Sequence, residues 1–348
     1  MGEPKDDART PRVDPAKSGV DRRDFLKLGA AATVGFLARD PDFIGAGVAS
    51  AAPQTLPPLP ENPRTRDAMP TRNLGQTGYR VGICSLGGES AVKAPNNEDQ
   101  AVAIVERALD LGVNYIDTAP RYGGDERWSQ RYLGQVMKRR RRETFLATKT
   151  HDRTRDGSLK LLEDSLTLLQ TDHLDLWQIH NLTRMEQLDQ IFAPDGAVKA
   201  LLEAREQGIV RHLGVTGHAD PHVLAEAIRR FPFDTILMAL NAADKHHLSF
   251  IDHLLPLAVE KQMGIIGMKV PARGRILGGS NGISMREAYN YVLSLPISTV
   301  IIGVDSIPQL EENIALARTF NPLNDAQMAQ LAARVEPIHR DALFFRRW

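Results

Sequence analysis

The stretch "NYIDTAPRYG" (Asn114–Gly123) has a form that recurs along this chain: a short apolar run, a polar residue at its end, then a loop. Tyr115 and Ile116 favour a strand. Asp117 ends the run, and a proline-containing loop then carries Tyr122. A carboxylate at the end of an apolar strand is costly to bury unless an opposite charge pairs with it. The stretch therefore predicts a buried strand whose C-terminal end holds a charged pair.

Eight apolar runs of this kind alternate with amphipathic helical stretches. The runs are Ile83–Leu86, Tyr115–Asp117, Phe145–Thr148, Leu174–Ile179, His212–Val215, Thr235–Ala239, Gly264–Met268 and Thr299–Ile302. Eight strand–helix units in about 250 residues match an α/β fold of the (β/α)8 TIM-barrel type. No G-x-G-x-x-G follows any run, so a Rossmann site has no support.

Local signals around these runs agree with a barrel. Arg72–Gly82 predicts a short N-terminal β-hairpin that turns at Gln76–Gly78. Asp220 followed by Pro221 predicts a helix start. The spacing Ser284-x-x-Glu287 predicts a capping box, and Glu311–Arg318 predicts the helix that closes the series.

The composition is that of a globular protein without a strong overall field. The 348 residues contain 43 basic and 43 acidic side chains, which gives no reason to expect a nucleic-acid partner. The single cysteine, Cys84, excludes an intramolecular disulfide and a cysteine-based metal cluster. His246, His247 and His253 lack the spacing of a ligand set, so no metal site is predicted.

Residues 1–51 look like a twin-arginine export signal. Arg22 and Arg23 precede a Phe-Leu-Lys sequence and a short apolar run, and Ala49–Ala51 supplies small residues for cleavage. The apolar run is too short for a stable membrane span. A disordered N-terminus with a chance arginine pair is the alternative. The signal predicts recognition by the twin-arginine machinery and export to the periplasm or the extracellular space.

Two further regions follow the signal. Residues 52–70 contain several prolines and are predicted to form a linker or extended arm. Residues 71–348 are predicted to form the barrel domain.

Polar residues at the strand ends of a TIM barrel face one shared mouth. Asp117, Tyr122, Lys149 and His180 come from three consecutive strands and their loops. Lys149 is the natural partner of Asp117, and its charge is expected to lower the pKa of Tyr122. Tyr122 would then donate a proton to a developing alkoxide while His180 orients a carbonyl. Such a site needs a hydride, which implies a bound cofactor.

Together these features resemble the aldo-keto reductase family over roughly Arg72 to Ala333. The resemblance rests on the following sequences: "RNLGQTGYRV", "IDTAPRYGGDE", "FLATKT", "LEDSLTLLQTDHLDLWQIH", "GIVRHLGVTGH" and "IIGVDSIPQLEEN". It implies that Asp117, Tyr122, Lys149 and His180 form the catalytic tetrad of a reductase acting on a small aldehyde or ketone.

The resemblance also implies NAD(P)H bound extended over the barrel mouth. The positions implied as cofactor contacts are Asp117, Thr216, Gly217, Met268, Lys269, Arg273, Gly274, Gln309, Glu312 and Asn313. Thr216 and Gly217 stand where the family usually has Ser-Asn at the carboxamide. Glu312 and Asn313 take the adenine-binding positions.

Several positions depart from the usual family pattern. Met268 replaces a stacking Tyr, and Gly303 and Gln309 replace a Lys and an Arg that grip the 2′-phosphate in many members. NADP is still expected, because Lys269, Arg273 and Arg275 could compensate, and NAD stays possible.

Two questions stay open in the sequence. A nucleotide-binding regulatory or sensor protein with little turnover is the alternative to a reductase, because the cofactor positions are altered while the tetrad is intact. The tail Phe344–Trp348 could pack into the core or cover the substrate pocket.

Overall fold

The computed structural model describes residues 55–347. The predicted export signal and the first residues of segment 52–70 lie outside the described residues.

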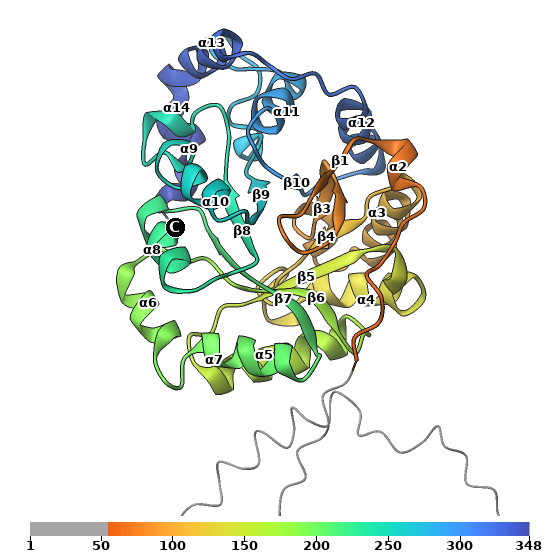
Figure 1. Ribbon diagram of the computed structural model, residues 1–348. Coiled ribbons are helices and arrows are strands. Elements are labelled where there is room, and N and C mark those ends of the chain that lie inside the picture. Colours follow the sequence, from red (N-terminus) through yellow and green to blue (C-terminus); the bar gives the residue numbers. More distant parts are fainter. Residues whose placement is uncertain (1–54, 348) are drawn as a thin grey trace, which may run out of the picture. The chain divides into compact units, whose positions relative to one another are not determined.

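Eight parallel strands close into a barrel in the order β10-β3-β4-β5-β6-β7-β8-β9 (Figure 1). Their bounds are β3 (Cys84–Gly87), β4 (Tyr115–Asp117), β5 (Phe145–Thr150), β6 (Leu174–Ile179), β7 (Val210–Gly217), β8 (Thr235–Ala239), β9 (Gly264–Met268) and β10 (Thr299–Ile302). The predicted (β/α)8 TIM barrel is confirmed.

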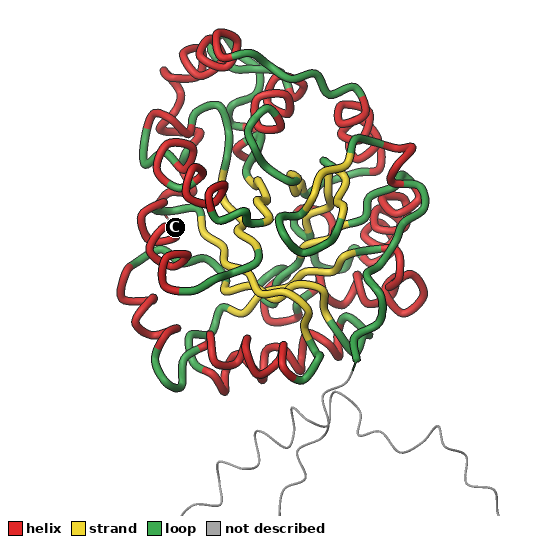
Figure 2. The backbone as a smooth tube through the Cα atoms, viewed as in Figure 1, coloured by secondary structure: helices red, strands yellow, loops and turns green. Residues whose placement is uncertain are grey.

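Helices surround the strands on the outside (Figure 2). Their bounds are α2 (Thr65–Ala68), α3 (Glu98–Asp110), α4 (Trp128–Arg140), α5 (Arg155–Leu168), α6 (Met185–Phe192), α7 (Ala197–Glu206), α8 (Pro221–Arg230), α9 (Phe250–His253), α10 (Leu255–Glu260), α11 (Met285–Leu293), α12 (Ile307–Arg318), α13 (Asp325–Val335) and α14 (His339–Ala342). The predicted caps are present: Asp220 accepts from His222 N, and Ser284 and Glu287 form a capping box. Helix α12 starts earlier than predicted because Ser306 caps it.

Two strands are longer than the apolar runs predicted. Strand β5 continues through Lys149 to Thr150, and β7 continues to Gly217. The reason is the ladder itself, because Lys149 and Thr150 pair with Gln178 and Ile179 of β6. Polar residues thus extend these strands because the adjacent strand supplies partners for their backbone hydrogen bonds.

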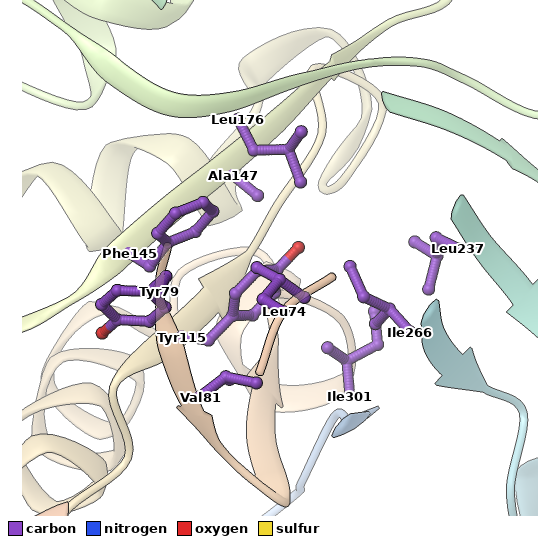
Figure 3. Close-up of a cluster of buried hydrophobic side chains, with 10 residues drawn as sticks. All are labelled: Leu74, Tyr79, Val81, Tyr115, Phe145, Ala147, Leu176, Leu237, Ile266 and Ile301. Atoms are coloured by element: carbon purple, nitrogen blue, oxygen red, sulfur yellow. The ribbon is translucent and has the colours of Figure 1, made fainter. Parts of the chain in front are cut away.

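The N-terminal hairpin closes one end of the barrel. Strands β1 (Thr71–Asn73) and β2 (Arg80–Gly82) pair antiparallel, as predicted. The hairpin side chains join buried residues of the barrel strands in one hydrophobic cluster (Figure 3). Gly75 has φ +55, and a Cβ there would lie 2.2 Å from Gly264 N. Only glycine allows the hairpin turn to sit this close to the start of β9.

The described part of segment 52–70 lies against the same end of the barrel. The buried amide of Asn62 donates to Leu109 O and Val113 O, at 2.8 and 3.0 Å. Arg211 donates to Pro57 O at 2.5 Å. These contacts attach the segment at the N-terminal ends of the strands, away from the mouth.

Candidate active site

Strand alternation brings three polar side chains together above the apolar cluster. Tyr115, Ala147 and Leu176 belong to the cluster inside the barrel. Because side chains alternate along a strand, the residues two positions later also face inward. These residues are Asp117, Lys149 and Gln178, and all three are buried.

Lys149 contacts Asp117, Thr118 and Tyr122 and so links them at the candidate site. Its Nζ forms an ion pair with Asp117 and donates to Thr118 O at 2.8 Å and to Tyr122 Oη at 3.4 Å. These contacts use the three donors of an ammonium group. Gln178 Nε2 donates to the other oxygen of Asp117 at 2.9 Å. Loss of solvation raises the pKa of Asp117 above its usual value, although Lys149 and Gln178 oppose the change.

The expected effect of Lys149 on Tyr122 is wrong. Loss of solvation raises the pKa of Tyr122 well above its usual value, and the carboxylates of Asp117 and Glu89 raise it further. The Lys149 ammonium is already engaged by Asp117, and Glu89, whose place near the phenol the sequence did not reveal, adds a second negative charge. Tyr122 is therefore a neutral phenol near neutral pH, which is the form that can donate a proton.

His180 lies beside Tyr122 at the mouth. The two rings meet edge to face with centroids 6.0 Å apart. Loss of solvation lowers the pKa of His180 well below its usual value, and Lys149 and His151 add to the shift. The imidazole is therefore neutral near neutral pH.

A cavity of about 590 Å³ begins at Asp117 and Tyr122 and extends to α12. Its lining includes most of the predicted cofactor positions: Asp117, Met268, Lys269, Arg273, Gly274, Gln309, Glu312 and Asn313. Thr216 and Gly217 are not part of the lining. Thr216 Oγ1 instead accepts from Asn181 N at 2.8 Å.

Glu89 is a cavity residue that sequence reasoning missed. It follows β3, and its carboxylate contacts Lys93 at 3.1 Å and Arg273 at 3.2 Å. Burial alone would raise the pKa of Glu89, but Lys269, Lys93 and Arg273 hold it below its usual value. The signal in the sequence was its position just after the first barrel strand, because the other candidate site residues also end or follow barrel strands.

Lys269 is the most perturbed cation of the cavity wall. Loss of solvation, together with Arg273, Lys93 and Lys149, lowers the pKa of Lys269 to about 8, against the opposite effect of Glu89. The residue therefore changes charge close to neutral pH.

The C-terminal tail packs into the protein next to the mouth. Phe345 and Arg346 are buried, and Arg346 forms a buried ion pair with Asp244. Arg346 also donates to His218 O at 2.8 Å, one residue beyond β7. The tail, which lies near α8 and α9 in Figure 1, thus contacts the loop that follows β7. Of the two alternatives for the tail, packing into the protein is the one that Phe345 and Arg346 follow.

Residues 55–347 contain neither a candidate metal site nor a candidate membrane span. No group of three or more His, Cys, Asp or Glu side chains there is placed to hold a metal ion. No helix in the same range is long and apolar enough to cross a membrane.

Known proteins are similar to this chain in sequence and in fold. A sequence model described as "Aldo/keto reductase family" matches residues 80–283, more than half of the chain. "Uncharacterized oxidoreductase YqkF" of Bacillus subtilis is 26% identical over 295 residues, covering 72% of this chain and 91% of the relative. "L-galactose dehydrogenase" of Arabidopsis thaliana is 28% identical over 308 residues, covering 77% of this chain and 94% of the relative.

Solved structures support the fold. The holo form of an aldo-keto reductase from Bacillus halodurans, AKR11C1, matches with a TM-score of 0.64 at 24% identity. The match covers 78% of this chain and 96% of that one.

Proposed function

The chain belongs to the aldo/keto reductase family, and from this premise we propose that it reduces an aldehyde or ketone to an alcohol with NADPH or NADH. The contact of Lys149 with both Asp117 and Tyr122 at the head of the cavity carries the proposal.

The cavity fits an extended nicotinamide dinucleotide. Its volume of about 590 Å³ lies within the range of cofactor pockets. Lys269 and Arg273 are suited to a pyrophosphate, and the buried amide of Asn313 lines the far end. Bound there, the nucleotide supplies a hydride.

The side chains at the mouth supply the proton. Tyr122 Oη donates it to the oxygen that becomes the alcohol, and its raised pKa keeps the proton in place until negative charge develops. Lys149 and Asp117 hold the phenol in position. The neutral imidazole of His180 donates a hydrogen bond to the same substrate oxygen.

Single-turnover hydride transfer tests the proposal. The protein is loaded with NADPH or NADH, mixed with 4-nitrobenzaldehyde, and followed by loss of nucleotide absorbance. Tyr122→Phe is expected to slow the reaction by at least about 10²-fold, the scale of general acid catalysis, with unchanged nucleotide binding. Tyr291→Phe, which removes a hydroxyl on α11, is the control.

The result also separates the reductase from the sensor alternative. Nucleotide binding without hydride transfer in the wild-type protein would favour a sensor. Equal rates for Tyr122→Phe and the wild type would contradict the role of Tyr122.

We also propose that the protein is exported through the twin-arginine pathway. Support comes from the Arg22–Arg23 pair, the apolar run and the small residues that follow it.

A further inference from the structure

The cations of the cavity gather at the end that holds the catalytic centre. Lys93 and Arg273 both contact Glu89. Lys269 is close enough to Glu89, and to Lys149, for their charges to shift its pKa. Since Lys149 contacts Tyr122, this whole group lies toward the reacting end.

The part of the cavity at the start of α12 carries carboxylates without a paired cation among the described residues. Asp305 and Glu312 line the cavity there, both are exposed, and neither has an ion pair within residues 55–347. Gln309 is uncharged, and its Oε1 accepts from Asp305 N at 2.7 Å. The nearby cation Arg107 is bound to Glu311 at 2.6 Å, outside the cavity lining.

The helix terminus at this end is already compensated. Asp305 directly precedes Ser306, whose side chain caps α12. A negative charge at this position offsets the partial positive charge of a helix N-terminus. The terminus therefore attracts a further anion less than it would without Asp305.

The charges along the cavity balance. The lining cations Lys93, Lys269 and Arg273, with Lys149 behind Asp117, are matched by four lining carboxylates: Glu89, Asp117, Asp305 and Glu312. A 2′-phosphate adds a charge of about −1.5 to −2 at neutral pH. A ribose 2′-hydroxyl adds none, and it can donate a hydrogen bond to a carboxylate.

Arg275 does not change this balance. It is ion-paired with Asp341 at 2.6 Å and lies over the ring of Phe344, and it is not part of the cavity lining.

From these observations we infer that the Asp305 end of the cavity selects NAD(H) over NADP(H). The inference rests on the proposed function, with the reacting ring at Tyr122 and the adenosine toward α12. Asp305 accepts from the ribose hydroxyls of NAD(H) and repels a 2′-phosphate. The selection differs from the NADP expected from the sequence, because Arg273 is ion-paired with Glu89.

Dissociation constants of NADH and NADPH, measured by nucleotide fluorescence on the nucleotide-free protein, test the inference. Wild-type protein is expected to bind NADH at least about tenfold more tightly than NADPH, which is the scale of close charge interactions near a surface. Asp305→Asn is expected to narrow this ratio by about three- to tenfold through tighter NADPH binding.

Glu89→Gln is the matched control, because it removes a cavity carboxylate that is already paired with Lys93 and Arg273. It is expected to change both dissociation constants by a similar factor and to leave their ratio nearly unchanged. Raising the salt concentration should narrow the wild-type ratio, because screening weakens an interaction between exposed charges.

The outcomes distinguish the inference from the proposed function. Tighter binding of NADPH than NADH by the wild type would overturn the inference and leave the reductase proposal intact. An equal change of the ratio in Asp305→Asn and Glu89→Gln would overturn the role of Asp305. Binding of neither nucleotide would overturn the proposed function itself.

Discussion

Lys149 is the residue on which the candidate site depends most. It lies on the inner face of β5 and is buried, and its three contacts reach a carboxylate, a backbone carbonyl and the phenol of Tyr122. The same side chain therefore neutralises Asp117 and positions the phenol of Tyr122.

Lys149→Met is expected to leave Asp117 buried without its counter-ion. We expect a loss of about 3–5 kcal/mol of unfolding free energy, the usual result of breaking a buried pair, together with loss of activity. Denaturant unfolding measures the first effect. The double variant Asp117→Asn/Lys149→Met should recover part of the stability but no activity. An unchanged stability in Lys149→Met would contradict the pairing.

We expect the proposed nucleotide binding to depend on pH through Lys269. Its ammonium form, which attracts phosphate, is present below its pKa of about 8 and is lost above it. Dinucleotide affinity should therefore fall as the pH rises through about 8. Titration calorimetry across this range measures the change. Lys269→Arg keeps its charge at these pH values and should flatten the profile. A profile equally steep in the variant would exclude Lys269 as the cause.

Among the elements, the strand ends were predictable and the loops were not. Asp117, Lys149 and His180 could be assigned to one mouth because each ends or follows an apolar run. The position of Glu89 depends on how the loop after β3 meets Arg273, which no periodicity encodes. The raised pKa of Tyr122 was missed because its largest cause is loss of solvation, to which Asp117 and then Glu89 add, and burial of a loop side chain is not encoded in periodicity either.

The C-terminal tail is a second element that the sequence left undecided. The sequence shows three aromatic and two basic residues, but only the structure shows that Arg346 is buried against Asp244 while Arg347 is exposed. Adjacent arginines thus have different roles.

Arg346→Met is expected to cost about 3–5 kcal/mol of unfolding free energy, because it leaves the buried carboxylate of Asp244 unpaired. Arg347→Met, with the same chemical change at an exposed position, should have little effect. Chemical denaturation of the two variants provides the comparison. Equal stability of both would show that the tail does not anchor the fold.

At the scale of the whole molecule, the predicted barrel and hairpin are both present, while the N-terminal 54 residues lie outside the described range. The twin-arginine pathway carries folded proteins, so the proposal of export makes a demand on the barrel. It must be complete, with any nucleotide bound, before it leaves the cytoplasm.

Replacing Arg22 and Arg23 by lysine should keep the protein in the cytoplasm, folded and able to bind nucleotide, because neither residue belongs to the barrel. Cell fractionation and a binding assay on the retained protein check both parts. Lysine replacements of Arg9 and Arg12, outside the proposed motif, should leave export unchanged. Export of the Arg22/Arg23 variant would remove the twin-arginine proposal.

The hairpin has a consequence for the time course of synthesis. It is among the first parts of the barrel domain to be translated, yet its turn at Gly75 rests against Gly264, and β3 pairs with β10 near the other end of the chain. At about 5–20 residues per second, the strands against which the hairpin packs are completed on the order of tens of seconds after the hairpin itself. During that interval the apolar side chains of the hairpin are unburied while the N-terminal segment is already outside the ribosome. Under the proposal of export, a chaperone that shields the nascent hairpin would act before the barrel is complete.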